Sequence, residues 1–188
     1  MLDDQAFLVL NALYLKKMAL VEDLADIAGL PTAQVRAMVS GFDQSGWVLD
    51  MGEELLIQPD GMTEVQAHYR QTYADLSQAE EMGRWYGRFE TINTQFIKHV
   101  TDWQQTGGDA RAQERVIGTV ERLVKLIGEM VEQVPRYDSY IRRFERSMTT
   151  VDQGNADFVC TPTVDSLHNI WFEFHEDFLL LLGKERTE

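Results

Sequence analysis

The sequence predicts a mainly α-helical protein in two parts: short helices with one β-hairpin over residues 1–75, and an antiparallel helical bundle over residues 76–188. Apolar residues recur at steps of three and four through the long stretches after residue 78, a spacing typical of amphipathic helices. Only residues 47–57 show short apolar runs on either side of a glycine, which is the pattern of a hairpin.

Three helices are expected before the hairpin. The first is a buried helix over about residues 4–17, a stretch that contains four closely spaced leucines. The second begins at the acidic residue Glu22, which suits a positive helix N-terminus, and ends at Gly29. Pro31 starts the third helix, because proline fits the first helical turn, and Gly46 ends it.

The hairpin is expected from two short strands, residues 47–50 and 55–57, joined through residues 51–54. Gly52 stands in that connection, where a tight turn needs a residue that tolerates a positive φ. A further helix is expected to start at about Asp60.

Four longer helices are expected in the second part of the chain. Their predicted ranges are residues 78–105, 110–133, 137–151 and from Pro162 to about 182. The first two are separated by the clearest break in the pattern, Thr106-Gly107-Gly108-Asp109. Four helices of this kind predict an antiparallel bundle, which either closes on itself or is completed by a second copy of the chain.

The charges are strongly unbalanced. The net charge is −14, from 31 acidic and 17 basic residues, and residues 1–70 hold eleven acidic residues against four basic ones. This balance disfavours DNA and anionic membranes, and it favours a cationic ligand or a basic surface on a protein partner. No apolar stretch is long enough to span a membrane, and the acidic start of the chain is unlike a targeting peptide, so a cytoplasmic protein is expected.

A family resemblance lies in the first third of the chain. The segment Leu24-Ala25-Asp26-Ile27-Ala28-Gly29-Leu30-Pro31, the turn Ser45-Gly46-Trp47-Val48 and the exit Leu55-Leu56-Ile57-Gln58-Pro59-Asp60-Gly61 resemble the winged helix-turn-helix of MarR-type bacterial regulators.

The resemblance implies that the third helix reads DNA in the major groove and that the wing touches the backbone. The side chains that would contact bases are Thr32, Gln34, Arg36 and Ser40. Arginine and glutamine can pair with guanine and adenine, respectively. The wing tip departs from the family, because it carries acidic residues where the family usually has basic ones, and this opposes DNA binding.

The last predicted helix carries the densest chemistry. His168, Trp171 and His175 fall on one helical face at spacings of three and seven residues. The two histidines are two turns apart, about 10.5 Å, so one helix cannot chelate a metal through them, and no metal site is predicted. With Trp85, Phe89 and Asn93 they form either a packed core, a pocket for a small apolar or aromatic ligand, or a docking surface.

No catalytic arrangement is found in the sequence. It contains no glycine-rich phosphate loop, no HExxH, no serine elbow and no cysteine pair, so we expect neither an enzyme nor a cofactor. The single Cys160 is expected to be a small buried side chain. The basic residues Arg136, Arg142, Arg143 and Arg146 are interleaved with acidic ones, which predicts a salt-bridged surface rather than a phosphate groove.

Two functions remain open from the sequence. The first is a ligand-responsive transcriptional regulator that forms a homodimer and binds DNA, as the MarR resemblance implies. The second is an accessory or regulatory subunit that does not bind DNA and docks a larger enzyme through protein contacts. The helical C-terminal half, with the stretch 171–177 near its end, resembles small proteins associated with phosphoenolpyruvate-utilising phosphotransferases. A phosphotransferase of this kind would then be the larger enzyme.

Overall fold

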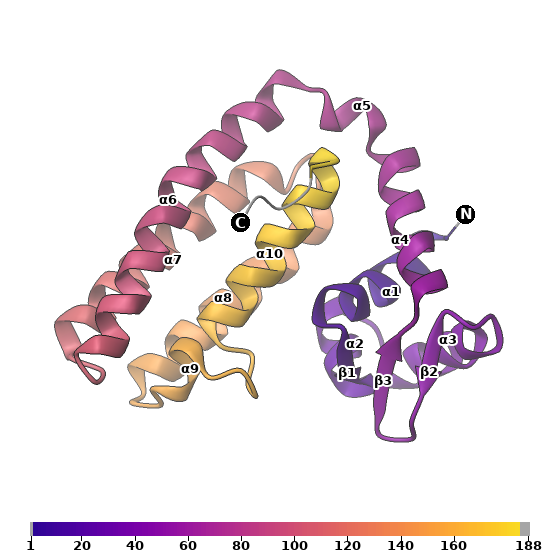
Figure 1. Ribbon diagram of the computed structural model, residues 1–188, viewed down its shortest axis with the longest axis horizontal. Coiled ribbons are helices and arrows are strands. Elements are labelled where there is room, and N and C mark those ends of the chain that lie inside the picture. The colour runs from indigo at the N-terminus through magenta and orange to yellow at the C-terminus, as the bar shows by residue number, and fades with distance from the viewer. Residues whose placement is uncertain (1, 185–188) are drawn as a thin grey trace. The chain divides into compact units, whose positions relative to one another are not determined.

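The computed structural model describes residues 2–184, which form ten α-helices, one 3₁₀ helix and three short strands (Figure 1). The expectation of a mainly α-helical protein with a small β-element is confirmed. The chain divides into two compact units. The first comprises Met1–Gln78 and the chain from Glu176 onward, and the second comprises Ala79–His175.

The first unit contains most of the short elements. They are α1 (Asp4–Lys16), β1 (Met18–Leu20), α2 (Val21–Ala28), α3 (Thr32–Gln44), β2 (Val48–Asp50), β3 (Glu54–Ile57), α4 (Pro59–Thr72) and α5 (Ala74–Ser77). The Asp3 carboxylate caps α1 by accepting from the backbone N–H of Ala6 at 2.8 Å. Gly29 ends α2 in the left-handed conformation, as expected of a C-cap glycine.

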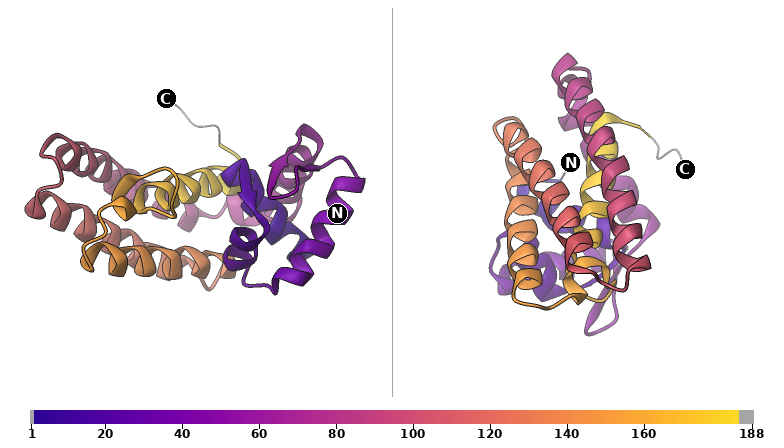
Figure 2. Two further views of the ribbon diagram at one scale, coloured as in Figure 1. Left: turned by 90° about the horizontal axis from the view of Figure 1, so that it is seen from below. Right: turned by 90° about the vertical axis from the view of Figure 1, so that its left-hand side faces the viewer.

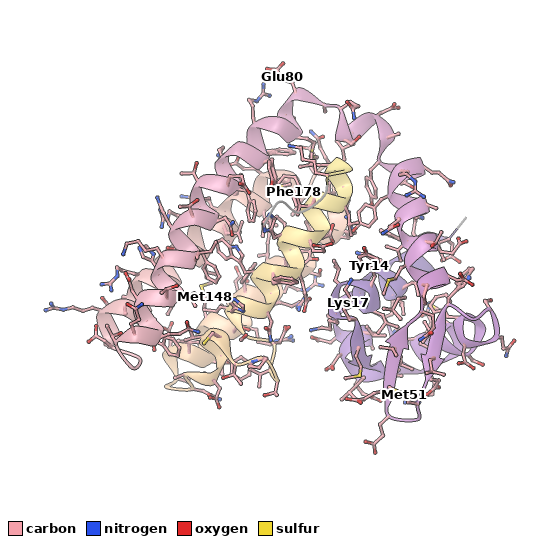
Figure 3. All side chains as sticks on the ribbon, in the orientation of Figure 1. Tyr14, Lys17, Met51, Glu80, Met148 and Phe178 are labelled. Carbon is pink, nitrogen blue, oxygen red and sulfur yellow. The ribbon has the colours of Figure 1, made fainter. Side chains whose placement is uncertain are left out.

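The three strands form one antiparallel sheet in the order β1-β3-β2. The sequence predicted only β2 and β3. The extra strand follows Lys17, a non-glycine residue with a φ of 68°, which turns the chain sharply at the end of α1. The Lys17 ammonium lies 4.0 Å from the centre of the Tyr14 ring (Figure 3), and this contact accompanies the turn that brings Met18–Leu20 beside β3.

Gly61 fixes the start of α4 against the hairpin. A Cβ atom at this position would lie 2.3 Å from the carbonyl oxygen of Trp47, so no other residue fits without a backbone shift. The backbone N–H of Gln58 donates to the same carbonyl at 2.9 Å, which holds the end of β3 at this place. The glycine therefore sets how closely α4 approaches the start of β2.

A buried polar chain crosses the core of the first unit. The Tyr69 hydroxyl donates to the Asn11 side-chain oxygen at 3.0 Å, and the Asn11 amide donates to the Asp177 carboxylate at 3.4 Å. All three side chains are buried, so each hydrogen bond satisfies a group that water cannot reach. Asp177 belongs to the last turns of the chain, which thereby join α1 in this unit.

The second unit is built from long helices. It contains α6 (Glu80–Gln105), α7 (Ala110–Met130), the 3₁₀ helix η1 (Pro135–Tyr137), α8 (Asp138–Asp152), α9 (Asp157–Cys160) and most of α10 (Leu167–Leu182). Figures 1 and 2 show α6, α7, α8 and α10 lying side by side. The turn between α6 and α7 uses Gly107 and Gly108 with positive φ, and the Asp109 carboxylate then caps α7.

The last helix begins at Leu167, and the expectation that Pro162 opens it was wrong. Residues 161–166 form turns instead, because the Asn169 side-chain amide donates to three carbonyl oxygens of this segment at 2.8–3.2 Å. The Ser166 hydroxyl accepts from the backbone N–H of Asn169 at 3.3 Å and so caps the first turn of α10.

Candidate functional site

The exposed side of α3 carries the residues predicted to read DNA. Val35, Val39 and Phe42 bury the opposite side of this helix in the first unit. Thr32, Arg36 and Ser40, spaced four residues apart, are exposed together, and Gln34 is half-buried.

Two of these side chains already have partners. Arg36 lies 3.2 Å from the Glu22 carboxylate of α2, with both side chains more than half exposed. The Gln34 amide donates to the side-chain oxygen of Gln5 at 2.7 Å. An exposed ion pair contributes little stability and can open. Arg36 is nevertheless the single cation in residues 32–58, a range that also holds four acidic residues, so α3 and the hairpin have little to offer a phosphate backbone.

The outer face of the small sheet is apolar. Directly paired residues of antiparallel strands point to the same side, and Met18 of β1 pairs with Leu56 of β3, which pairs in turn with Leu49 of β2. Two residues away from Leu56 along β3, Glu54 pairs with Leu20 of β1. The backbone N–H of Met51 donates to the carbonyl oxygen of Glu54 from the other neighbouring strand side. We call this set of apolar residues the apolar sheet face: Met18, Leu20, Leu49, Met51 and Leu56.

The apolar sheet face is exposed to an unusual degree. Met18, Leu20, Leu49 and Met51 are 40–51% exposed, and the Met51 side chain lies at the tip of the hairpin (Figure 3). Among residues 2–184, the other large apolar side chains of comparable exposure are Ile97 and Phe172, both in the second unit. Exposed apolar residues that gather on one face mark an interaction site more often than scattered ones do.

Sequence reasoning missed this face because half of it comes from β1. The alternation of buried Val48 with exposed Leu49 is a strand signal, but the sequence alone gives no reason to place Met18 beside it. The acidic hairpin tip was visible from the sequence. This tip carries Asp50, Glu53 and Glu54, all exposed, and Glu54 lies on the same side of the sheet as its partner Leu20.

Four of the six aromatic and polar residues singled out in the second unit, Phe89, Asn93, Trp171 and His175, are brought together between α6 and α10. Trp85 instead lies near Glu129 of α7. Trp171 stacks on Phe96 with ring centres 3.7 Å apart, and its indole N–H donates to the Asn93 side-chain oxygen at 2.9 Å. The Phe89 ring lies 6.1 Å from Trp171 and 4.8 Å from His175. The buried members of the set are Trp85, Phe89, Trp171 and His175.

These contacts favour a packed core over a ligand pocket. The side-chain oxygen of Asn93, which would have oriented a ligand, accepts the Trp171 indole N–H. His168 is exposed, with its ring 6.4 Å from that of Phe96. The imidazole Nε2 of His175 lies 3.8 Å from the Glu90 carboxylate. Within residues 2–184, no three His, Cys, Asp or Glu side chains are grouped closely enough to hold a metal ion.

A buried ion cluster joins α8 to α10. Arg143 donates to both carboxylate oxygens of Asp165, at 2.9 and 2.6 Å, and to Glu173 at 2.7 Å. Burial alone would lower the pKa of the Arg143 guanidinium, but the two carboxylates raise it, so the side chain stays charged. The expectation of a salt-bridged surface holds for Arg142, which pairs with Asp138, but not for Arg143, which is 3% exposed.

Two further expectations concern Cys160 and membranes. Cys160 is half-buried, and its sulfur accepts from the Gln104 amide at 3.7 Å. None of the helices in the described part of the chain is sufficiently long and apolar to cross a membrane.

No family model matches this chain, and neither the curated proteins nor the solved structures include a significant match to it.

Proposed function

We propose that the first unit is a winged helix that binds a protein, and that the chain is an accessory or regulatory subunit of a larger enzyme. The observation that carries this proposal is the apolar sheet face, which is exposed beside an acidic hairpin tip. The order of elements from α1 to β3, with a sheet of order β1-β3-β2, supports the winged-helix assignment. Winged helices are used as protein-docking modules as well as DNA readers.

The charges favour a protein partner over DNA. Residues 1–78 and 176–188 together hold 16 acidic and six basic residues. A DNA-binding surface needs several cations on one face, because phosphate contacts supply most of the affinity. An apolar centre with an acidic rim instead fits a partner whose apolar residues are surrounded by lysine and arginine.

The partner class is suggested by the resemblance noted for the helical C-terminal half. Small proteins of that kind are associated with phosphoenolpyruvate-utilising phosphotransferases, so such an enzyme is the first partner to test. The aromatic residues of the second unit would then serve the packing of that unit.

The test is an affinity capture of the tagged full chain from its native lysate, with and without nuclease, followed by analysis of bound protein and DNA. We expect a stoichiometric protein that survives nuclease treatment. The double variant Leu49→Ser/Met51→Ser should lose this protein. The matched control Ile97→Ser, an exposed apolar residue on α6 of the second unit, should retain it.

A second candidate function is a dimeric, ligand-responsive transcriptional regulator. The shared exposure of Thr32, Arg36 and Ser40 on one side of α3 favours it. In that case Arg36 would leave Glu22 to read a base, and the residues between α6 and α10 would respond to a small apolar ligand. Enrichment of one DNA segment that is lost at high salt and in Arg36→Ala would support this function and contradict the docking proposal.

A further inference from the structure

We propose that the surface between α6 and α7 holds a binding site for a phosphate-type oxyanion, formed by His99, Arg115 and Arg122 around the hydroxyl of Thr119. We call this set the His99 site. It lies wholly within the second unit and does not depend on the docking role proposed above.

The Thr119 hydroxyl organises the site. It is fully buried and donates to the backbone carbonyl of Arg115 one turn earlier, at 2.8 Å. Its oxygen is therefore left to accept two hydrogen bonds, one from the Arg122 guanidinium at 2.9 Å and one from His99 Nδ1 at 2.9 Å. This pattern assigns the proton of the neutral imidazole to Nδ1, so the other ring nitrogen, Nε2, is not used by Thr119.

In the described part of the chain, the two arginines of the site have no carboxylate partner. The Arg122 guanidinium donates three hydrogen bonds: to the Gly118 carbonyl oxygen at 3.1 Å, to the Gln95 side-chain oxygen at 2.5 Å and to the Thr119 hydroxyl. All three acceptors are uncharged. Arg115 is exposed, and within residues 2–184 it forms neither an ion pair nor a side-chain hydrogen bond. Two guanidinium charges thus stand uncompensated in a chain of net charge −14.

The imidazole of His99 faces an excess of positive charge. Burial lowers its pKa first, and the cations Arg115 and Lys98 lower it further. A hydrogen bond with the Arg115 backbone raises the pKa, and Arg122 lowers it by a smaller amount, so the net direction is downward. Asp102, whose pKa is affected by His99, is bound by Lys98 at 2.6 Å, so these two charges largely offset each other. The cations from α7 that lower the pKa of His99 are Arg115 and Arg122.

An oxyanion with two negative charges would relieve this repulsion. Guanidinium groups donate paired hydrogen bonds to phosphate oxygens, and a protonated imidazole adds a donor at Nε2. A Cβ atom added to Gly118, which stands between Arg115 and Arg122 in the sequence of α7, would meet nothing within 4 Å. Binding would favour the protonated imidazole, so bound phosphate should raise the pKa of His99.

The experiment follows the four histidine rings of the full chain by NMR while inorganic phosphate is added at constant ionic strength, with sodium chloride as the balancing salt. We expect a saturable change at His99 and an increase of about 0.5 to 1 in its pKa. Arg115→Ala should abolish the response to phosphate. Arg142→Ala, which removes an exposed arginine paired with Asp138 on α8, should leave it intact.

Additional arms distinguish the sources of the anion. Glycerol 2-phosphate tests whether a phosphate monoester binds as well as the free anion, and a response to either one supports the site. The proposal is overturned if sodium chloride alone reproduces the change, if Arg115→Ala still responds, or if only a short DNA duplex perturbs His99. The last result would make this surface a nucleic-acid contact instead.

Discussion

The indole nitrogen of Trp171 donates a hydrogen bond to the side-chain oxygen of Asn93, 2.9 Å away, while the indole ring stacks on Phe96. The contact joins α10 to α6 in the interior of the second unit, and it uses both the polar and the apolar parts of the tryptophan. A buried indole needs such an acceptor, because an unpaired N–H in the core costs free energy. Asn93 therefore has a structural role that the sequence pattern could not separate from ligand binding.

Trp171→Ala should lower the free energy of unfolding by about 3–5 kcal/mol, because it opens a large cavity and leaves Asn93 without its donor. The neighbouring residue Phe172 is 46% exposed and provides a matched control. Phe172→Ala should cost less than about 1 kcal/mol. Urea unfolding of the two variants measures the difference, and similar small losses would show that Trp171 belongs to an interaction surface rather than to the core.

Gly61→Ala should destabilise the first unit by about 1–3 kcal/mol, because the new methyl group meets the Trp47 carbonyl and cannot move away. Gly41 is the matched control, since it lies within α3 and a Cβ atom there meets nothing within 4 Å. Gly41→Ala should stabilise the protein by about 0.5–1 kcal/mol through its better helix propensity. The measurement is the midpoint of thermal unfolding of each variant. If both midpoints shifted in the same direction, the close approach of Gly61 to the Trp47 carbonyl would be contradicted.

Local signals in the sequence predicted much of the fold. Gly29 ends α2, Gly52 turns the hairpin with a φ of 99°, and residues 106–109 separate α6 from α7. These features depend on a residue and its immediate neighbours, so the sequence contains the information. The serine at 166 precedes an apolar run and caps α10, but the proline at 162 is a competing signal for a helix start in the sequence.

Features that depend on distant residues could not be predicted in the same way. Strand β1 has three residues and exists because β3, more than 30 positions later, pairs with it. The burial of Arg143 depends on carboxylates 22 and 30 positions away. The apolar sheet face and the ion cluster both follow from such long-range pairing, which composition and periodicity do not contain.

Arg143→Met should lower the free energy of unfolding by about 3–5 kcal/mol, because it leaves the Asp165 and Glu173 carboxylates buried without a cation. Arg142→Met, in the adjacent exposed pair with Asp138, should cost less than about 1 kcal/mol. The double variant Arg143→Met/Glu173→Leu should recover part of the loss, since it removes one of the unpaired charges. Chemical denaturation measures the free energy of unfolding of each variant. Equal decreases for Arg143→Met and Arg142→Met would rule out a special role for the buried cluster.

His99 should make the protein less stable as the pH falls. Its pKa in the folded chain is lowered by burial and by the neighbouring cations, so the unfolded chain binds the proton first. Well above the ordinary histidine pKa of about 6.5 the imidazole is neutral in both states and contributes nothing to this effect. As the pH falls through about 6.5 toward the lower pKa of the folded chain, stability is lost.

The measurement compares the thermal midpoint of the wild type with that of His99→Gln from about pH 8 to about pH 5. The wild type should lose more stability across this range, because glutamine has the size and polarity of histidine but does not titrate. Arg115→Ala should reduce the loss, because removing a facing cation raises the pKa of His99 toward its ordinary value. If all three proteins lose stability in parallel, the pH dependence comes from other groups, and the positive charges around Thr119 do not act on the imidazole.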